Sequence, residues 1–183
     1  MVVQSNGIAW EASLDEARER AHREGKALLL DFRTAPLSPT SLAVDNVMYL
    51  NPRVVAFIRR HVVPVMVVSR ANPAASSGDE GCRAPIVIVG DGEGGPHYRV
   101  EGFLSPVDFI AQLGLGLGRY RFDRHEYAEA IRHFEEVADR HEDTQAAAQA
   151  LFWLGVARYK QSTEPSQTRS NGEKLLKGGS VSS

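Results

Sequence analysis

The sequence predicts an α/β protein, in which a three-layer α/β/α domain is followed by an all-α extension. Two observations indicate this fold class. Apolar strand-like runs alternate with helical patterns up to about residue 113, whereas only helical periodicity follows from Gly114. A chain of 183 residues with 43% hydrophobic content is long enough for one ordinary domain and an appendage. We therefore expect the α/β domain at residues 7–113, the helical extension at 114–161, and a polar, disordered tail at 162–183.

The first elements carry standard strand and helix signals. Apolar residues alternate with a small one over residues 8–10, which predicts a short strand. Ser13 and Glu16 form a capping box, which predicts a helix over residues 14–24. The continuous apolar run at 27–32 is typical of a central strand covered on both faces.

The rest of the domain follows from cap residues and further apolar runs. The expected elements are a helix at 51–60, strands at 62–68, 85–89 and 97–100, and a helix beginning at residue 105. Residues 69–83 are rich in turn formers and predict a loop. Gly90 to Gly95 lies between two strands, so we interpret it as a hairpin loop and not as a phosphate loop.

Several residues occur in the order in which a thioredoxin-like domain carries them. They are Trp10, Asp31-Phe32, Pro39, the run Val62-Val63-Pro64-Val65, and Ala84-Pro85. The chain therefore resembles the thioredoxin-like family, and in particular bacterial proteins in which such a domain precedes a tetratricopeptide-like helical hairpin. The resemblance covers about residues 7–160 and implies a thioredoxin-like fold.

The turn after Asp31-Phe32 departs from the family pattern. In the family this strand-to-helix turn carries Cys-Gly-Pro-Cys, whereas this chain has Leu37-Ser38-Pro39-Thr40. Thiol–disulfide exchange needs an attacking thiolate and a resolving thiol, and Leu37 and Thr40 supply neither. The resemblance thus implies a scaffold for cell redox homeostasis that has lost its redox chemistry. We interpret the only cysteine, Cys82, as an ordinary loop thiol.

The resemblance also implies a binding groove and a buried acid. The groove would lie between Thr40 and the loop at Ala84 and Pro85, with a cis peptide bond before Pro85. In redox-active relatives the acid at Asp31 helps to move protons, and a lysine on the next strand pairs with it. Met66 stands at that lysine position. A buried carboxylate must be protonated or hydrogen-bonded, so Asp31 is either a catalytic acid or, as we favour, a remnant satisfied by water or a hydroxyl.

A second interpretation concerns the hydroxyl groups of the motif. Ser38 and Thr40 precede a helical pattern, and free N–H groups at a helix start favour an anion or a thiolate. Glutathione-transferase-like proteins use a hydroxyl in a similar place to hold the sulfur of glutathione. The alternative function is therefore a glutathione-related enzyme or a ligand-binding protein, although a capping role also explains Ser38.

The helical extension resembles about one and a half tetratricopeptide repeats. The pairs Leu117-Gly118 and Leu154-Gly155 recur 37 positions apart, and residues 127–134 have the small-then-aromatic spacing of a second repeat helix. The glycines at positions 114, 116 and 118 predict close helix packing or a junction between domains.

Residues 146–160 are apolar on nearly every face, and a helix of this kind is normally buried on more than one side. One side can rest on the hairpin of residues 106–140, but the polar tail after Ser162 offers no further helix to cover the other. Some of them are expected to form an uncovered stripe for self-association or for a partner helix. The candidates for this stripe are Leu151, Phe152, Trp153, Val156 and Tyr159. The alternative is that this helix folds back onto the α/β domain.

Composition excludes several classes of function. A net charge of −2 without a basic stripe argues against nucleic-acid binding, and no apolar run reaches the length of a membrane span. The six histidines show no metal-ligand spacing, and no metal or cofactor is expected. A single cysteine favours the cytoplasm. The sequence thus predicts a redox-inactive, polypeptide-binding or scaffold module and not an enzyme.

Overall fold

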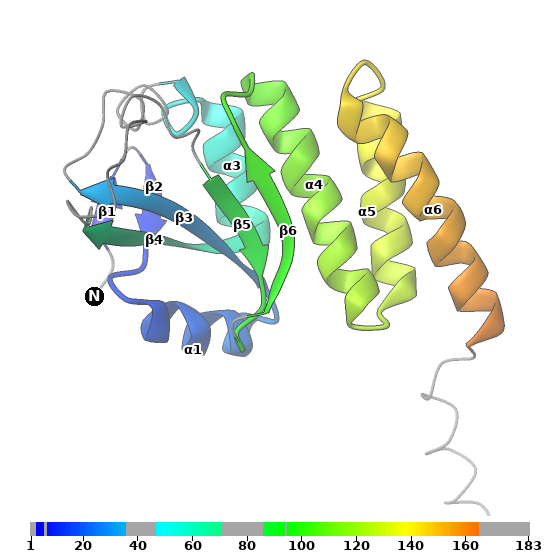
Figure 1. Cartoon of the computed structure of the whole chain (residues 1–183), viewed down its shortest axis with the longest axis horizontal. Coiled ribbons are helices and arrows are strands. Elements are labelled where there is room, and N and C mark those ends of the chain that lie inside the picture. Colours follow the sequence, from blue (N-terminus) through cyan, green and yellow to red (C-terminus); the bar gives the residue numbers. More distant parts are fainter. Residues whose placement is uncertain (1–2, 6, 36–46, 71–85, 94, 165–183) are drawn as a thin grey trace, which may run out of the picture.

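The computed structural model describes residues 3–5, 7–35, 47–70, 86–93 and 95–164, which build a three-layer α/β/α domain and a helical C-terminal region (Figure 1). The central sheet has the strand order β4-β3-β5-β6. Its strands are β3 (Ala27–Ala35), β4 (Val62–Arg70), β5 (Ile86–Gly90) and β6 (Pro96–Glu101). β3 and β4 run parallel, whereas β5 is antiparallel to both of its neighbours. The predicted fold class is confirmed.

A small hairpin precedes this sheet. It pairs β1 (Val3–Ser5) with β2 (Ile8–Trp10) in antiparallel register. The sequence predicted only β2, because the three residues of β1 show no recognisable apolar alternation. The Glu11 N–H donates a hydrogen bond of 2.9 Å to the Pro64 carbonyl, which ties the hairpin to β4.

One helix covers one face of the sheet. α1 (Leu14–Glu24) begins where Ser13 Oγ accepts a hydrogen bond from the Glu16 N–H at 3.1 Å. It ends at Gly25, whose φ of 63° suits glycine. The buried residues of this layer come from α1, β3 and β4: Ala17, Ala21, Leu28, Leu30, Val63 and Val65.

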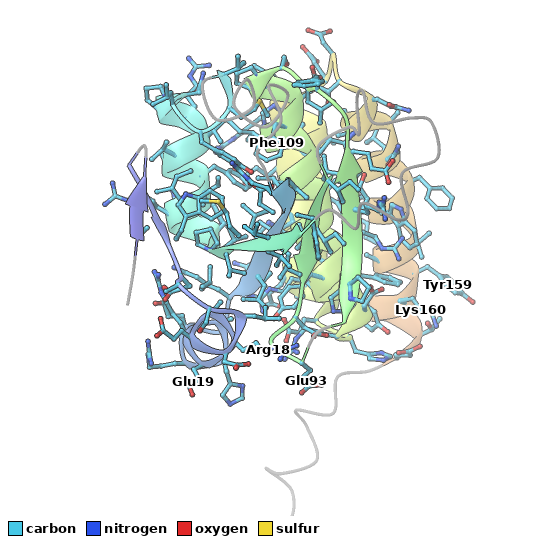
Figure 2. All side chains as sticks on the ribbon, turned by 60° about the vertical axis from the view of Figure 1, so that its left-hand side comes forward. Arg18, Glu19, Glu93, Phe109, Tyr159 and Lys160 are labelled. Carbon is cyan, nitrogen blue, oxygen red and sulfur yellow. The ribbon has the colours of Figure 1, made fainter. Side chains whose placement is uncertain are left out.

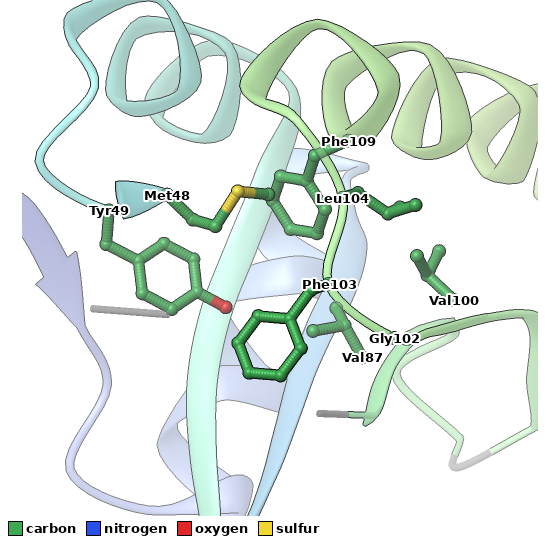
Figure 3. A pocket seen from close by; sticks show the side chains of 8 residues that line it. All are labelled: Met48, Tyr49, Val87, Val100, Gly102, Phe103, Leu104 and Phe109. Carbon is green, nitrogen blue, oxygen red and sulfur yellow. The ribbon is translucent and has the colours of Figure 1, made fainter. Parts of the chain in front are cut away.

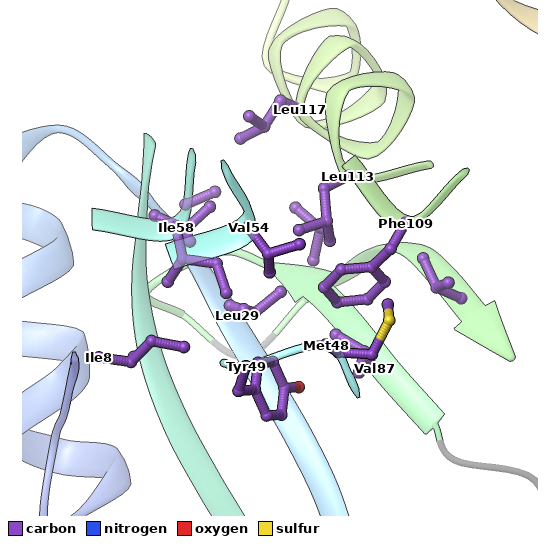
Figure 4. Packing of buried hydrophobic residues seen from close by; sticks show 14 of the residues in the cluster. Ile8, Leu29, Met48, Tyr49, Val54, Ile58, Val87, Phe109, Leu113 and Leu117 are labelled. Atoms are coloured by element: carbon purple, nitrogen blue, oxygen red, sulfur yellow. The ribbon is translucent and has the colours of Figure 1, made fainter. Parts of the chain in front are cut away.

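Two helices cover the opposite face. These are α3 (Pro52–His61), capped by Asn51, and α4 (Pro106–Asp123), capped by Ser105. Their apolar side chains meet those of the sheet in the largest core cluster, part of which Figure 4 shows. Strand alternation decides which side chains enter it, so Leu29 lies in this core while Leu28 and Leu30 face α1.

α4 also begins the helical region, where it packs against α5 (Tyr127–Arg140) and α6 (Gln145–Thr163) (Figure 1). The domain boundary expected between residues 113 and 114 falls inside α4, which continues without a break. Two of its glycines lie in the contact with α5. A Cβ on Gly114 would lie 2.6 Å from Val137 Cγ2, and one on Gly118 would overlap the Phe134 ring. These glycines permit close packing of α5, as expected, within one helix and not at a junction between two.

α6 is buried on one side, and its other side is left uncovered. Its buried residues are Ala146, Ala147, Ala150, Leu154 and Ala157, which pack in the core shared with α4 and α5. Leu151, Phe152 and Tyr159 are exposed. α6 ends at Thr163, two residues into the expected tail, and residues 165–183 lie outside the described part of the chain.

Candidate functional site

The expected site belongs to one edge of the sheet. Phe32 pairs with Ile86, and Ile86 pairs with Glu101, so the end of β3, the start of β5 and the end of β6 lie side by side. The motif Leu37-Ser38-Pro39-Thr40 follows β3 in the chain, and Ala84-Pro85 precedes β5. These six residues and Cys82 lie outside the described residues, so their expected roles stay predictions.

Asp31 is buried and forms an ion pair with a neighbour on its own strand. Residues two apart on a strand share a face, and this places Arg33 beside Asp31 on the face that α3 and α4 cover. Arg33 Nη2 and Nε donate hydrogen bonds of 2.7 Å and 3.0 Å to Asp31 Oδ2. Both side chains are only 4% exposed. The Arg33 guanidinium is thus a partner of Asp31 that the sequence did not lead us to expect.

The neighbouring strand provides no charge at this point. In the parallel register Asp31 lies opposite Met66, which confirms the predicted alignment of these two residues. Met66 packs against the apolar core, and the Arg33 guanidinium carbon lies 5.8 Å from the centre of the Tyr49 ring. The positive partner of the acid thus comes from the same strand.

Arg33 is the residue of this site that the sequence analysis missed. The signal was present, since a cation stands two positions after an acid inside a strand-forming run. The apolar run that predicts the strand ends at Phe32, so its periodicity does not indicate a pairing between positions 31 and 33.

An apolar pocket opens beside this ion pair. Met48 and Tyr49 line it from one side, Phe109 comes from α4, and Val87 belongs to β5 (Figure 3). The remaining lining residues are Val100, Gly102, Phe103 and Leu104. Its volume is about 20 Å³, room for about one water molecule. It is too small for a cofactor, and the described residues of its lining offer one hydroxyl and no charged group.

One exposed apolar side chain lines the pocket, and three others lie near pocket residues in the chain. Phe103 is 57% exposed, and it follows Gly102, whose φ of 92° is a conformation that favours glycine. Val47 and Leu50 flank Met48 and Tyr49 in the chain, and both are about half exposed. Val107 is also exposed, two residues before Phe109. We call Val47, Leu50, Phe103 and Val107 the apolar rim. Such a surface suits apolar side chains of a polypeptide.

Two histidines outside this site contact side chains of other parts of the fold. His97 lies between Asp91 Oδ2 and Asp123 Oδ2, at 2.9 Å and 2.8 Å, and so joins the β5–β6 turn to the end of α4. His133 packs edge-on against His61, and burial lowers its pKa to about 4. Within the described residues, no group of three or more His, Cys, Asp and Glu side chains could hold a metal ion.

A search for membrane spans gave no hit: among the described residues, no helix is both long and apolar enough to cross a bilayer.

Comparison with known proteins bears on the fold and the family. Among solved structures, the chain is similar to one titled DsbH oxidoreductase, at 17% identity and a TM-score of 0.45, covering 64% of this chain and 91% of that one. It is also similar to a thioredoxin from Thermus thermophilus, at 17% identity and a TM-score of 0.43, covering 58% of this chain and 85% of that one. A search of curated proteins finds no match. A family model described as thioredoxin-like matches residues 9–100, half of the chain, and this chain therefore belongs to the thioredoxin-like family.

Proposed function

We propose that this protein is a redox-inactive member of its family that binds polypeptides, a protein-binding or scaffold module and not an enzyme. The ion pair between Asp31 and Arg33 is the observation that supports this best. An acid that moves protons must gain and lose one, whereas a carboxylate bonded twice to a buried guanidinium is held in its charged form. The alignment of Leu37 and Thr40 with the two cysteine positions supports the same conclusion.

The apolar rim supports the binding part of the proposal. Phe103 of this rim lines the pocket, whose described lining holds no charged group, and exposed apolar side chains of this kind are typical of protein-binding surfaces. In this proposal the bound polypeptide is extended, and it places one apolar side chain against Phe103 and the pocket. The tetratricopeptide-like character of α5 and α6, a bacterial source and a cytoplasmic location belong to the same proposal.

Insulin reduction with dithiothreitol tests the redox part. The wild-type protein should not exceed the uncatalysed rate, because no second thiol is present to resolve a mixed disulfide. The variant Cys82→Ser serves as the control. Turnover in the wild type that disappears in Cys82→Ser would overturn the proposal.

Binding to alkylated insulin B chain, an unfolded polypeptide without reactive thiols, tests the second part. Phe103→Asp should weaken binding at least about tenfold, because it puts a charge at the centre of the apolar rim. Phe152→Asp on α6 introduces the same change on an exposed aromatic far from the pocket in the chain and should leave binding unchanged. Equal losses in both variants, or no binding by the wild type, would contradict a binding site at this edge.

Unfolding experiments test the ion pair itself. Arg33→Met takes two hydrogen bonds and the positive charge away from a buried carboxylate, so it should lower the free energy of unfolding by about 3–5 kcal/mol. The double variant Asp31→Asn with Arg33→Met should recover most of this loss. A cost below about 1 kcal/mol for Arg33→Met would show that Asp31 does not depend on Arg33 for its charge.

A further inference from the structure

The outer side of α6 carries large apolar side chains that the fold leaves uncovered. Leu151, Phe152 and Tyr159 are 59%, 65% and 66% exposed. Figure 2 shows Tyr159 projecting outward from α6, away from the rest of the molecule. Trp153 does not belong to this side, because it is half-buried with the Arg119 guanidinium 3.7 Å above its ring. Val156 is half-buried at the edge.

The exposed residues of this side follow a heptad spacing. The outer stripe consists of Ala148, Phe152, Gly155, Tyr159 and Ser162, all of them exposed. Their separations are 4, 3, 4 and 3 positions, the repeat with which two helices pack side by side. Large and small residues alternate along it, so that Phe152 and Tyr159 are knobs and the other three are holes.

Gly155 is the residue that the fold itself does not explain. Glycine in the middle of a helix lowers stability relative to alanine. In α4 the glycines are required, because a Cβ on Gly114, Gly116 or Gly118 would meet side chains of α5 or of the sheet at 3.0 Å or less. A Cβ on Gly155 would meet nothing within 4 Å. The space next to Gly155 thus has the form of a hole without its knob.

We propose that α6 pairs with α6 of a second copy of this chain, in antiparallel direction about a two-fold axis. The outer stripe fits itself in one register. When Phe152 lies over Gly155 of the partner subunit, Tyr159 lies over Ala148 of the partner subunit, and the two-fold axis repeats both contacts. Each of these four contacts sets an aromatic ring against a small residue, whereas a parallel pair would set Phe152 against its own copy.

Charge and sequence favour a second copy over other occupants. Along the outer stripe and its flanks the only charged residue is Arg158, which forms an ion pair of 2.7 Å with Glu135 of its own chain. Two such faces therefore meet without repulsion and without an unpaired charge. The 19 residues after Glu164 hold only three large apolar residues, Leu175, Leu176 and Val181. They are too few to cover the outer stripe.

The size of the contact predicts a weak dimer. The uncovered parts of Leu151, Phe152 and Tyr159 in two copies amount to roughly 700 Å². With the small and polar residues around them, the contact reaches about the lower limit of specific interfaces, near 1,200 Å². Dissociation in the micromolar range is therefore expected. This inference goes beyond the proposed function, since it concerns a different surface and does not depend on redox inactivity or on the apolar rim.

Sedimentation equilibrium of the full chain tests the pairing. The wild type should form dimers that dissociate in the micromolar range. Gly155→Leu and Ala148→Leu fill the holes and should each weaken dimerisation at least about tenfold, although both add apolar surface. Gln161→Leu adds the same side chain on the opposite side of the helix and should change nothing. Phe103→Asp should also leave the dimer intact, which separates this surface from the apolar rim.

The same measurements can contradict the proposed pairing of α6 with α6. A wild type that stays monomeric up to about 1 mM would overturn it. Stronger dimerisation by Gly155→Leu would show a different register, since added bulk helps only where Gly155 does not receive a ring. If a chain shortened after Glu164 dimerises and the full chain does not, residues 165–183 cover the outer stripe in place of a second copy. Because Gly155 faces open space, melting temperatures of the variants should not fall below that of the wild type, and circular dichroism checks this.

Discussion

α4 and α6 are both apolar helices with internal glycines, but the protein uses them differently. α4 is covered on two sides, since Phe109, Leu113 and Leu117 face the sheet core while Ala111 and Leu115 lie in the core with α5 and α6. α6 is covered on one side and leaves two aromatic rings in solvent. An apolar helix sequence therefore indicates that the helix is buried, but it does not indicate whether the same chain or a second molecule covers it. In α4 the cover comes from the chain itself, whereas for α6 we propose a second copy.

α5 lies next to both helices, and its His133 gives the largest effect expected in the helical region. Burial, and after it the neighbouring His61, lower the pKa of His133 from 6.5 to about 4. Between these pH values the unfolded chain binds a proton that the folded protein does not, so the free energy of unfolding falls as the pH falls. The loss should reach about 3 kcal/mol near pH 4.

Urea unfolding of wild type and His133→Gln from pH 7 to pH 4 measures this effect. The variant should lose less stability than the wild type below pH 6.5, and the two profiles should run parallel above it. Identical slopes over the whole range would mean that His133 takes up a proton as readily in the folded protein as in the unfolded chain.

Gly118→Ala gives the next effect and addresses α4 directly. The added methyl group would overlap the Phe134 ring, which is fully buried and has no space to move into. Overpacking of this kind should outweigh the better helix propensity of alanine and lower the free energy of unfolding by about 2 kcal/mol. Chemical denaturation measures it, and an unchanged midpoint would show that α4 and α5 are not in close contact.

Arg119→Met tests the contact between the two compared helices. The guanidinium stacks on Trp153 at 3.7 Å, so its removal should cost about 1 kcal/mol while methionine keeps the aliphatic stem. The loss should appear as faster hydrogen exchange in α6 with little change in the sheet. Uniformly faster exchange would indicate that α6 does not open separately.

Gly155→Ala has the smallest effect, and its sign is opposite to that of Gly118→Ala. With nothing near the new methyl group, alanine should raise the free energy of unfolding by about 0.5–1 kcal/mol. Denaturation at a concentration well below the dimer dissociation constant gives this value. A destabilised variant would mean that Gly155 is required by the fold of one chain, and the comparison with α4 would fail.

Local signals in the sequence predicted most of the domain. The caps Ser13, Asn51 and Ser105 each begin a helix, because a side-chain oxygen accepts the first free backbone N–H groups. The register of Asp31 opposite Met66 was also correct, since the two apolar runs form parallel central strands. Patterns of this kind depend only on neighbours in the chain.

What the sequence did not reveal depended on contacts between distant residues. The glycines from Gly114 onward marked a change of composition, yet they serve a helix that continues through it. The all-round apolar composition of α6 suggested burial that one chain does not supply. Arg33 was overlooked although it lies two positions from Asp31, because a buried cation is rare enough that the apolar run was analysed without it.

The continuity of α4 has a consequence for how such a protein is inherited. Residues that close the sheet core, such as Leu113 and Leu117, alternate along this helix with Gly114 and Gly118, which receive α5. No cut point separates the two sets. Recombination could therefore not attach the helical extension, as a separate unit, to any thioredoxin-like domain or remove it from this one. Gain or loss of the extension would require a simultaneous change in α4, the last helix of the domain.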